Sequence, residues 1–232
     1  MNIVITGASR GIGKAIAEKF AAHGHHLFLC ARSEAALRTT AEALSKKYPS
    51  AIIKAKAFDV SRKEEAKAFG AWCLEFGVPD VLVNNAGVFM PGNVHNEPDG
   101  LLESQVAANL YSAYYVTRSV LPWMMEHKKG HVFNISSIAG LEAYPNGGAY
   151  SISKFAMDGF SKNLRAEMKA HNIKVTTVYP GAVLTDSWGG FDNSKNRIME
   201  AGDIAAMIYA ASQLSKGACV EEILLRPQLG DL

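Results

Sequence analysis

A glycine-rich turn near the N-terminus most constrains the fold of this chain. The apolar run Asn2–Thr6 leads into Gly7-Ala8-Ser9-Arg10-Gly11-Ile12-Gly13, and a helical pattern follows over residues 14–23. Glycines let the backbone approach a phosphate closely, and a helix N-terminus offers free N–H groups with positive potential. The spacing is G-x-x-x-G-x-G rather than the common G-x-G-x-x-G. With a strand before it and a helix after it, the turn predicts a dinucleotide site rather than a plain strand-to-helix connection.

The composition bounds the class of protein. The chain has 232 residues, of which 48% are hydrophobic, so residues 1–232 can form a single α/β unit around one sizeable core. A formal net charge of +2 with 20% charged residues argues against a nucleic-acid partner. The three cysteines form no C-x-x-C pair, which suits a reducing compartment and gives no metal framework. The N-terminal apolar run is too short for a signal peptide and no apolar stretch reaches about 18 residues, so we expect a cytoplasmic protein without a membrane partner.

Strand and helix patterns alternate along the rest of the chain. Strands are predicted at residues 2–6, 25–31, 51–58, 80–83, 131–135, 173–179 and 222–225. Helices are predicted at residues 14–23, from a Ser33 cap to about 47, from a Ser61 cap to about 76, and at 99–126, 150–170 and 203–214. Repeated units of this kind, joined by right-handed crossovers, predict a doubly wound parallel sheet, the Rossmann fold, with helices on both faces. The ends of its strands bring Gly7, Asn84, Ser137 and Pro180 to one rim.

The end of the second predicted strand indicates the type of cofactor. An acidic residue there would bind a ribose 2′-hydroxyl, whereas an arginine accommodates a 2′-phosphate. The chain has Cys30-Ala31-Arg32-Ser33 at this place, with no acid, and Arg10 of the glycine turn can reach the same place. We therefore expect NADP (NADPH) as the cofactor. The nearby His23, His25 and His26 have no Cys, Asp or Glu beside them, so no metal site is predicted.

Small and polar residues follow two of the other strands. Asn84-Asn85-Ala86-Gly87 end the fourth strand, where such residues suit a cofactor that lies across the sheet. Ser136-Ser137 end the fifth strand and would serve equally well as a helix cap. Asn109 falls in the middle of a predicted helix, where an asparagine usually faces solvent. Residues 186–200 carry Gly, Asn and Ser with little apolar period, which indicates a mobile lid over the site.

Tyr150 and Lys154 stand four residues apart, so in a helix their side chains share one face. An unperturbed phenol titrates near 10. A neighbouring ammonium favours the phenolate, so we expect Lys154 to lower the pKa of Tyr150. A phenol tuned in this way can exchange a proton near neutral pH. The spacing alone fits an exposed helix with a chance Tyr and Lys equally well, and its meaning depends on the other motifs.

Together these motifs resemble the short-chain dehydrogenase/reductase family over nearly the whole chain. The motifs occur in order and at the family's spacing. The interval from 137 to 150 fits the family pattern for Ser137, whereas Ser136 is one residue off. The resemblance rests on Thr6-Gly7-Ala8-Ser9-Arg10-Gly11-Ile12-Gly13, Asn84-Asn85-Ala86-Gly87, Asn109, Ser137 with Tyr150 and Lys154, and Pro180-Gly181 with Thr185.

The resemblance implies an NAD(P)-dependent oxidoreductase that acts on a small-molecule carbonyl compound or alcohol. By this resemblance, Tyr150 is the general acid in reduction and Ser137 hydrogen-bonds the substrate oxygen. Lys154 lowers the pKa of Tyr150 and holds the nicotinamide ribose. Asn109 helps to hold a water molecule that links Lys154 to solvent.

The resemblance also implies which residues bind the cofactor. Asp59 and Val60 border the adenine, while Val183 and Thr185 meet the nicotinamide carboxamide. The full expected set is Gly7, Ser9, Arg10, Gly11, Ile12, Gly13, Arg32, Asp59, Val60, Asn85, Ala86, Gly87, Tyr150, Lys154, Pro180, Gly181, Val183 and Thr185.

A narrower resemblance concerns the substrate. Residues 180–189 and the ending 220–227 are similar to bacterial sepiapterin-reductase-like members of the family. A pterin needs a carboxylate at its amino-pyrimidine edge, and Asp186, Asp192 and Asp231 all remain candidates. The nearest rival is a 3-oxoacyl-[acyl-carrier-protein] reductase, for which Lys195 and Arg197 would contact an acidic carrier.

Two further expectations complete the interpretation. A cofactor-binding regulator without turnover is the alternative from another class, but such a protein would be expected to lose Tyr150, Lys154 or Ser137. The predicted helices that carry Asn109 and Tyr150 also hold Tyr114, Tyr115, Phe155 and Phe160. The family commonly pairs these helices across a two-fold axis, so we expect a homodimer or homotetramer.

Overall fold

Seven parallel strands form the central sheet of the computed structural model, which describes residues 1–185 and 188–231. The strand order is β3-β2-β1-β4-β5-β6-β9, and every neighbouring pair runs parallel. The order reverses direction at β1, as expected for two βαβ halves that share a central strand. The strands are β1 (Asn2–Thr6), β2 (His26–Ala31), β3 (Ile52–Ala57), β4 (Val81–Asn84), β5 (Gly130–Ile135), β6 (Ile173–Pro180) and β9 (Glu222–Leu225).

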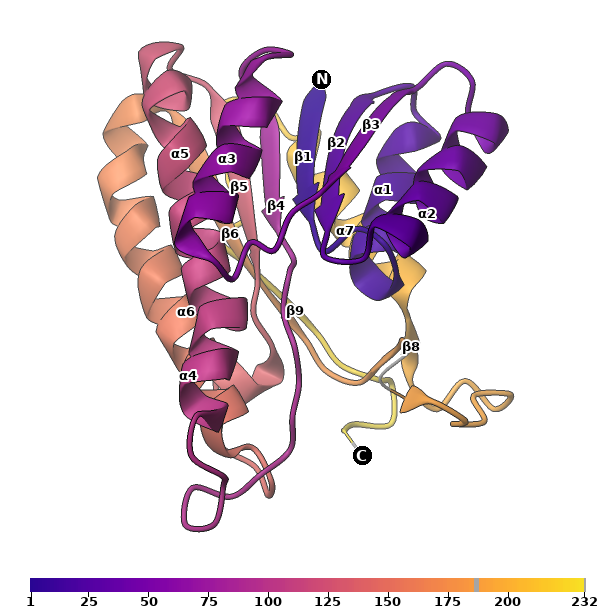
Figure 1. Ribbon diagram of the computed structural model, residues 1–232, viewed down its shortest axis with the longest axis vertical. Coiled ribbons are helices and arrows are strands. Elements are labelled where there is room, and N and C mark those ends of the chain that lie inside the picture. The colour runs from indigo at the N-terminus through magenta and orange to yellow at the C-terminus, as the bar shows by residue number, and fades with distance from the viewer. Residues whose placement is uncertain (186–187, 232) are drawn as a thin grey trace.

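Helices cover both faces of this sheet (Figure 1). One face carries α1 (Gly11–Ala21), α2 (Glu34–Lys47) and α7 (Ala201–Ser212), and the other carries α3 (Lys63–Leu74), α5 (Ser112–Glu126) and α6 (Gly148–Met168). Each face has its own apolar core, one centred on residues such as Phe20 and Ile208 and the other on Phe69 and Val116. The predicted doubly wound parallel sheet is confirmed. No helix in the described parts of the chain is both long enough and apolar enough to cross a bilayer.

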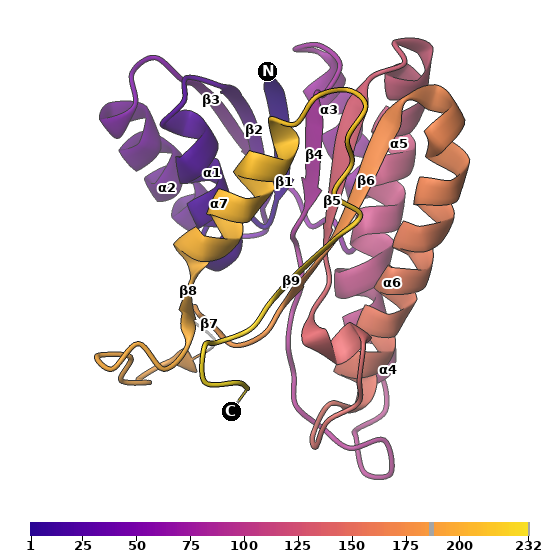
Figure 2. The same cartoon turned by 180° about the vertical axis from the view of Figure 1, so that it is seen from behind.

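The carboxyl ends of β1, β4, β5 and β6 meet at one rim, because these strands are parallel and adjacent. Gly7 follows β1, Asn84 ends β4, Ser137 follows β5, and Pro180 ends β6. The predicted rim is therefore confirmed. Figure 2, from behind, shows the segment after β9 running back toward the small β7–β8 sheet.

The start of α3 differs from the prediction. Ser33 caps α2 as expected, because its Oγ accepts from the N–H of Ala36 at 3.3 Å. Ser61 does not cap α3, which begins after Arg62. The hydroxyl and the N–H of Ser61 instead donate to Oδ1 of Asp59, at 2.6 and 3.2 Å, so Ser61 belongs to a turn closed by that carboxylate before the helix begins.

Two further segments differ from the sequence prediction. The expected helix over residues 99–126 is divided into α4 (Leu101–Val106), a π-helical turn at Ala107–Tyr111, and α5. Within the segment expected to be a lid, Met199–Glu200 forms a short strand, β8, which pairs in parallel with β7 (Val183–Leu184). The end of that segment is therefore paired with residues that precede it, beside the rim. A two-residue ladder is too short to leave a periodic pattern in the sequence.

Candidate active site

A polar lock holds the glycine turn against the end of β4. Oγ1 of Thr6 accepts from the N–H groups of Asn85 and Ala86, at 3.0 and 2.9 Å. Nδ2 of Asn85 donates back to the carbonyl oxygens of Thr6 and Gly7. A Cβ at Gly13 would lie 2.3 Å from the Gly7 oxygen, so only glycine fits between α1 and the turn. Gly7 itself has φ +66°, which is in the left-handed region.

The N-terminus of α1 can receive an anion. Its first turn, Gly11-Ile12-Gly13-Lys14, contains no acidic residue, and within the described residues Arg10 at the N-cap makes no capping bond with its side chain. The first N–H groups of the helix therefore keep their positive potential for a ligand. A Cβ on Gly11 would lie 3.2 Å from Cγ2 of Thr185, which brings the predicted Thr185 to the same place. These features fit the pyrophosphate of a dinucleotide.

The end of β2 lies beside the glycine turn, because the N–H of Ala8 donates to the Cys30 carbonyl at 3.0 Å. Arg32 follows directly and is exposed, as is Arg10. Both arginines are thus accessible to a phosphate in this region. Asp59 lies at the end of the neighbouring β3, where its carboxylate accepts from both the N–H and the hydroxyl of Ser61. Val60 is 5% exposed and belongs to the core.

Ser137 and Tyr150 meet directly at the rim. Ser137 begins a short 3-10 turn, Ile138–Gly140, by accepting from the N–H of Ala139 at 3.2 Å. Its hydroxyl is near enough to the Tyr150 phenol to act on the pKa of that phenol. Burial raises the pKa of Tyr150, and the Ser137 hydroxyl lowers it less. The expected lowering of this pKa is therefore wrong, because loss of solvent around the phenol outweighs the stabilisation of its anion.

Lys154 lies one turn beyond Tyr150 on α6, and the two side chains share a face as predicted. Its amine is 5.6 Å from the centre of the Tyr150 ring and donates to the Ile135 carbonyl at 2.9 Å. The residue is only 5% exposed, and burial lowers the pKa of Lys154 to about 8. The amine is thus mostly protonated at pH 7, with its charge directed toward Tyr150.

Asn109 lies in the π-helical turn and is completely buried, not solvent-facing as an isolated mid-helix asparagine would be. Its Oδ1 accepts from the N–H of Val88 at 2.7 Å, and its Nδ2 donates to the Val88 carbonyl at 3.0 Å. Nδ2 also donates to Oγ of Ser153, which links the turn to α6. Asn109 therefore joins the segment after β4 to the helix that carries Tyr150 and Lys154. π-Helical turns of this kind often occur at functional sites.

Comparison with known proteins agrees with this geometry. The family model described as short chain dehydrogenase matches residues 1–196. The chain belongs to the short-chain dehydrogenase family. It is 34% identical to an uncharacterized oxidoreductase of Staphylococcus saprophyticus, over 97% of this chain and 96% of that protein. It is 33% identical to a sepiapterin reductase of Chlorobaculum tepidum, over 99% and 97% of the two chains.

A solved structure of another member agrees as well. A metagenomic short-chain oxidoreductase in complex with NADP superposes with a TM-score of 0.86 at 31% identity, covering 98% of this chain and 97% of that one. The protein is thus an oxidoreductase of the short-chain dehydrogenase family.

The segment after β6 completes the rim of this dehydrogenase. Gly181 donates its N–H to the Leu225 carbonyl at 2.7 Å, so Pro180 and Gly181 are fixed against β9. Met199 donates its N–H to the Ala182 carbonyl, which holds Val183 beside β8. The residues of the expected cofactor set follow the ends of β1, β2, β3, β4 and β6 or lie in the first turns of α1 and α6.

The three carboxylates considered for a pterin differ in their surroundings. Asp186 lies outside the described residues. Asp192 is exposed and accepts from the N–H of Ser194. Asp231 forms an ion pair with Arg226 through Oδ2, while its Oδ1 is buried and has no hydrogen-bond partner among the described residues. A Cβ at Gly181 would lie 2.8 Å from that oxygen, so Asp231 stands next to the rim.

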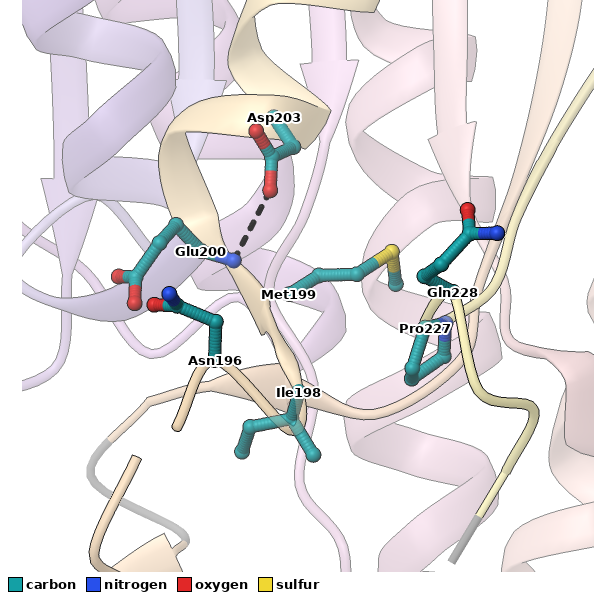
Figure 3. A pocket seen from close by; sticks show the side chains of 7 residues that line it. All are labelled: Asn196, Ile198, Met199, Glu200, Asp203, Pro227 and Gln228. Carbon is teal, nitrogen blue, oxygen red and sulfur yellow. Dashed lines mark hydrogen bonds between the residues drawn. The ribbon is translucent and has the colours of Figure 1, made fainter. Parts of the chain in front are cut away.

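A cavity of about 280 Å³ lies between β8, the start of α7 and the C-terminal segment (Figure 3). Asp203 accepts from the N–H of Glu200 at 3.0 Å within it, so this acidic pair already serves as a cap for α7. Within the described residues, no group of three or more His, Cys, Asp and Glu side chains could hold a metal ion. Four of its lining residues fall in the segment expected to be a lid. The cavity is lined by Asn196, Ile198, Met199, Glu200, Asp203, Pro227 and Gln228.

Two positioning residues were missed by the sequence analysis. Glu97 accepts from the N–H of Ala149 at 2.8 Å and so caps the helix that carries Tyr150. Gln105 binds the backbone of Met90 through both atoms of its amide. Both bonds join residues that are far apart in the chain, so no local capping pattern marks them.

The buried Lys154 predicts a pH dependence of stability. Its pKa is about 8 in the folded protein and 10.5 when unperturbed, so between these values the unfolded chain binds more protons and stability rises with pH. From pH 7 to pH 10, we expect the free energy of unfolding of the wild type to rise relative to that of Lys154→Met by about 2–3 kcal/mol. Urea unfolding of both proteins at pH 7, 8, 9 and 10 measures the difference. A constant difference would contradict the lowered pKa.

Proposed function

We propose that this protein reduces a small carbonyl compound to the alcohol with NADPH. The observation that carries the proposal is the junction of Ser137, Tyr150 and Lys154 at the rim. The Ser137 hydroxyl is near enough to the phenol to act on its pKa, and the buried amine of Lys154 lies 5.6 Å from the centre of the phenol ring. One site thus holds a hydroxyl that can bind a carbonyl oxygen, a phenol that can donate a proton, and an ammonium that can stabilise the resulting phenolate.

Each of these residues has a role that its surroundings support. Reduction places negative charge on the carbonyl oxygen, and the hydroxyls of Ser137 and Tyr150 stabilise it because they are positioned in advance. Tyr150 then gives its proton to that oxygen. Its raised pKa keeps the phenol protonated at pH 7, as a donor must be. The Lys154 ammonium stabilises the phenolate that remains, and Asn109 fixes the segment beside it.

The cofactor-binding residues follow from the same geometry. The start of α1 suits the pyrophosphate, Arg10 and Arg32 suit the 2′-phosphate, and Asp59 with Val60 suits the adenine. Residues 85–87 and Lys154 would hold the nicotinamide ribose. The segment 180–185 would meet the nicotinamide. The reduced nicotinamide supplies the hydride when it is bound.

The surroundings of Asp231 favour a pterin as one candidate substrate. The buried Oδ1 of Asp231 has no partner among the described residues and stands next to Gly181. A carboxylate in this state suits an amino-pyrimidine edge, which presents N–H donors. The similarity to the Chlorobaculum tepidum sepiapterin reductase points in the same direction.

The two rival functions have less support. An acyl-carrier-protein reductase would use Lys195 and Arg197, but Nη1 and Nη2 of Arg197 already donate to the carbonyls of Gly230 and Asp231, each at 2.9 Å. A regulator without turnover has no use for the complete set of Ser137, Tyr150 and Lys154. An assay of NADPH oxidation with a panel of activated carbonyl compounds separates the enzyme from the regulator.

The surface of α5 and α6 predicts a dimer or tetramer. Tyr114, Ile152 and Phe155 are each between 36% and 45% exposed on these helices. Such a group of apolar side chains is typical of a surface that pairs with a second copy. We expect light scattering at micromolar concentration to give an oligomer, and Phe155→Lys to shift it toward the monomer. Val94→Lys, at an exposed apolar residue elsewhere, should not change the mass, and a monomeric wild type would contradict the assignment.

Replacing Tyr150 by Phe tests the general acid. The change removes the hydroxyl and little volume, so we expect the affinity for NADPH to stay within about threefold while turnover falls by at least ~10²-fold. Steady-state NADPH oxidation and a cofactor titration measure the two effects. Tyr144→Phe is the matched control, because it removes a second phenol close to the first and should leave turnover within about threefold. Near-normal turnover in Tyr150→Phe would show that another group donates the proton.

Replacing Arg32 by Asp tests the choice of cofactor. A hydrogen bond to a charged group contributes roughly 1.5–3 kcal/mol, and tenfold in affinity corresponds to about 1.4 kcal/mol, so Arg10 and Arg32 should favour NADPH over NADH by at least about tenfold. Arg32→Asp should abolish or reverse this preference, because the carboxylate repels the phosphate. Arg38→Asp makes the same change of charge on the exposed face of α2 and is the control. Equal affinities in the wild type would mean that neither arginine reads the phosphate.

A further inference from the structure

Two side-chain amides hold the segment that follows β4. Asn109 binds Val88 through both its N–H and its carbonyl group, at 2.7 and 3.0 Å. Gln105 binds Met90 in the same way, at 3.3 and 3.1 Å, and is completely buried. Gln105 and Asn109 are four residues apart on one helical face, and Val88 and Met90 are two residues apart. The two amides therefore bind alternate residues of the segment, like two rungs of a strand ladder.

Phe89 is the residue between these two rungs. Its ring packs edge-on against that of Tyr150, with ring centres 4.9 Å apart and planes at 77°. It is nonetheless 46% exposed, although its neighbours in the chain are clamped on both sides. An exposed aromatic ring against the proton donor thus stands at the entrance of the site.

Tyr144 adds a second ring near the same place. It lies on the loop after the 3-10 turn and is 38% exposed. Burial and, to a smaller extent, the neighbouring Tyr150 together raise the pKa of Tyr144 to about 12, so the two phenols are close. The loop that carries it is joined to the segment after β4, because the N–H of Gly92 donates to the Asn146 carbonyl at 3.1 Å. Figure 1 shows these two connections side by side beyond the sheet.

We infer that Phe89 determines substrate specificity, selecting carbonyl compounds that carry a flat ring next to the carbonyl group. This inference rests on the proposed function, because it assumes that the carbonyl oxygen lies at Tyr150. The ring centre of Phe89 lies 4.9 Å from that of Tyr150, so Phe89 is a neighbour for a substituent next to that carbonyl group. A flat ring covers the exposed face of Phe89 and gains the preference of aromatic pairs for each other. A small aliphatic substituent covers much less of it.

The hydrogen bonds from Gln105 and Asn109 hold the segment around Phe89 in place before a ligand binds. An aromatic side chain on a free loop would lose conformational entropy when it orders on a ligand. Here the main-chain bonds from Gln105 and Asn109 order the segment in advance, so binding does not have to order it. Gln105 acts as a positioning residue, since it touches Met90 and not the site.

The test compares two 1,2-diones, 1-phenyl-1,2-propanedione and 2,3-butanedione, as substrates with NADPH. For Phe89→Ala we expect KM for the phenyl compound to rise about tenfold, with KM for butanedione within about threefold and kcat little changed for both. Phe89→Leu, which keeps an apolar side chain without a ring, should lose most of the same selectivity. Phe89→Tyr keeps the ring and should retain it.

The alternative is that Phe89 only supports Tyr150. In that case kcat would fall in Phe89→Ala by the same factor for both diones and selectivity would stay unchanged, which would overturn the inference and leave the proposed function intact. Gln105→Met provides a second variant, checked for folding by its Tm. It should raise KM for the phenyl compound alone, and an equal change for both diones would contradict its positioning role.

Binding separates this inference from the proposed function. Ligand-observed NMR measures the affinity of both diones for the NADP-loaded protein without any turnover. We expect the phenyl compound to bind about tenfold more weakly to Phe89→Ala than to the wild type. If this binding difference is present but the wild type shows no turnover, carbonyl reduction is refuted and recognition of the flat ring by Phe89 is supported. Equal binding of the phenyl compound to the two proteins would refute recognition by Phe89, whether or not the wild type turns over.

Discussion

A buried amine determines most of the arrangement at this site. Lys154 is almost fully enclosed, and a charged group so placed needs a strong acceptor, which the Ile135 carbonyl provides at 2.9 Å. That bond joins α6 to the end of β5. The bond fixes the position of α6 along its axis relative to β5. Tyr150, one turn earlier on α6, therefore lies near Ser137. The position of the phenol is therefore a consequence of where the lysine finds its acceptor.

The rest of the site is held by neutral amides. Asn85 ties the glycine turn to the end of β4, and Asn109 and Gln105 tie the next segment to the helix behind it. Deeper in the sheet, Asn84 donates to Asn134 at 2.8 Å and to Thr117 at 2.9 Å. Such bonds fix main-chain segments without adding charge near Tyr150. The only ammonium in contact with the phenol ring, among the described residues, is that of Lys154.

Patterns local to the sequence predicted the elements and the rim well. Tyr150 and Lys154 were found because a helix places residues four apart on one face, and the rim followed from parallel strands. Distant partners were not predictable. Nothing near Gln105 in the chain indicates that it will bind Met90, and the Ser61 prediction was wrong because Ser61 lies in a turn held by Asp59, one residue before the N-cap. The prediction for the pKa of Tyr150 was wrong for a related reason. The four-residue spacing places the Lys154 charge nearby, but it does not show that the phenol is buried.

In the proposed reaction, a carbonyl group at this site takes a hydride from the cofactor and a proton from Tyr150. Reduction of 2,3-butanedione with NADPH deuterated at the transferred C4 position, in ordinary water, tests it most directly. Mass spectrometry and NMR of the product locate the label. The account predicts one deuterium on the new carbinol carbon and none on its hydroxyl. An alcohol without deuterium on that carbon, or oxidation of the cofactor without formation of the alcohol, would contradict the account.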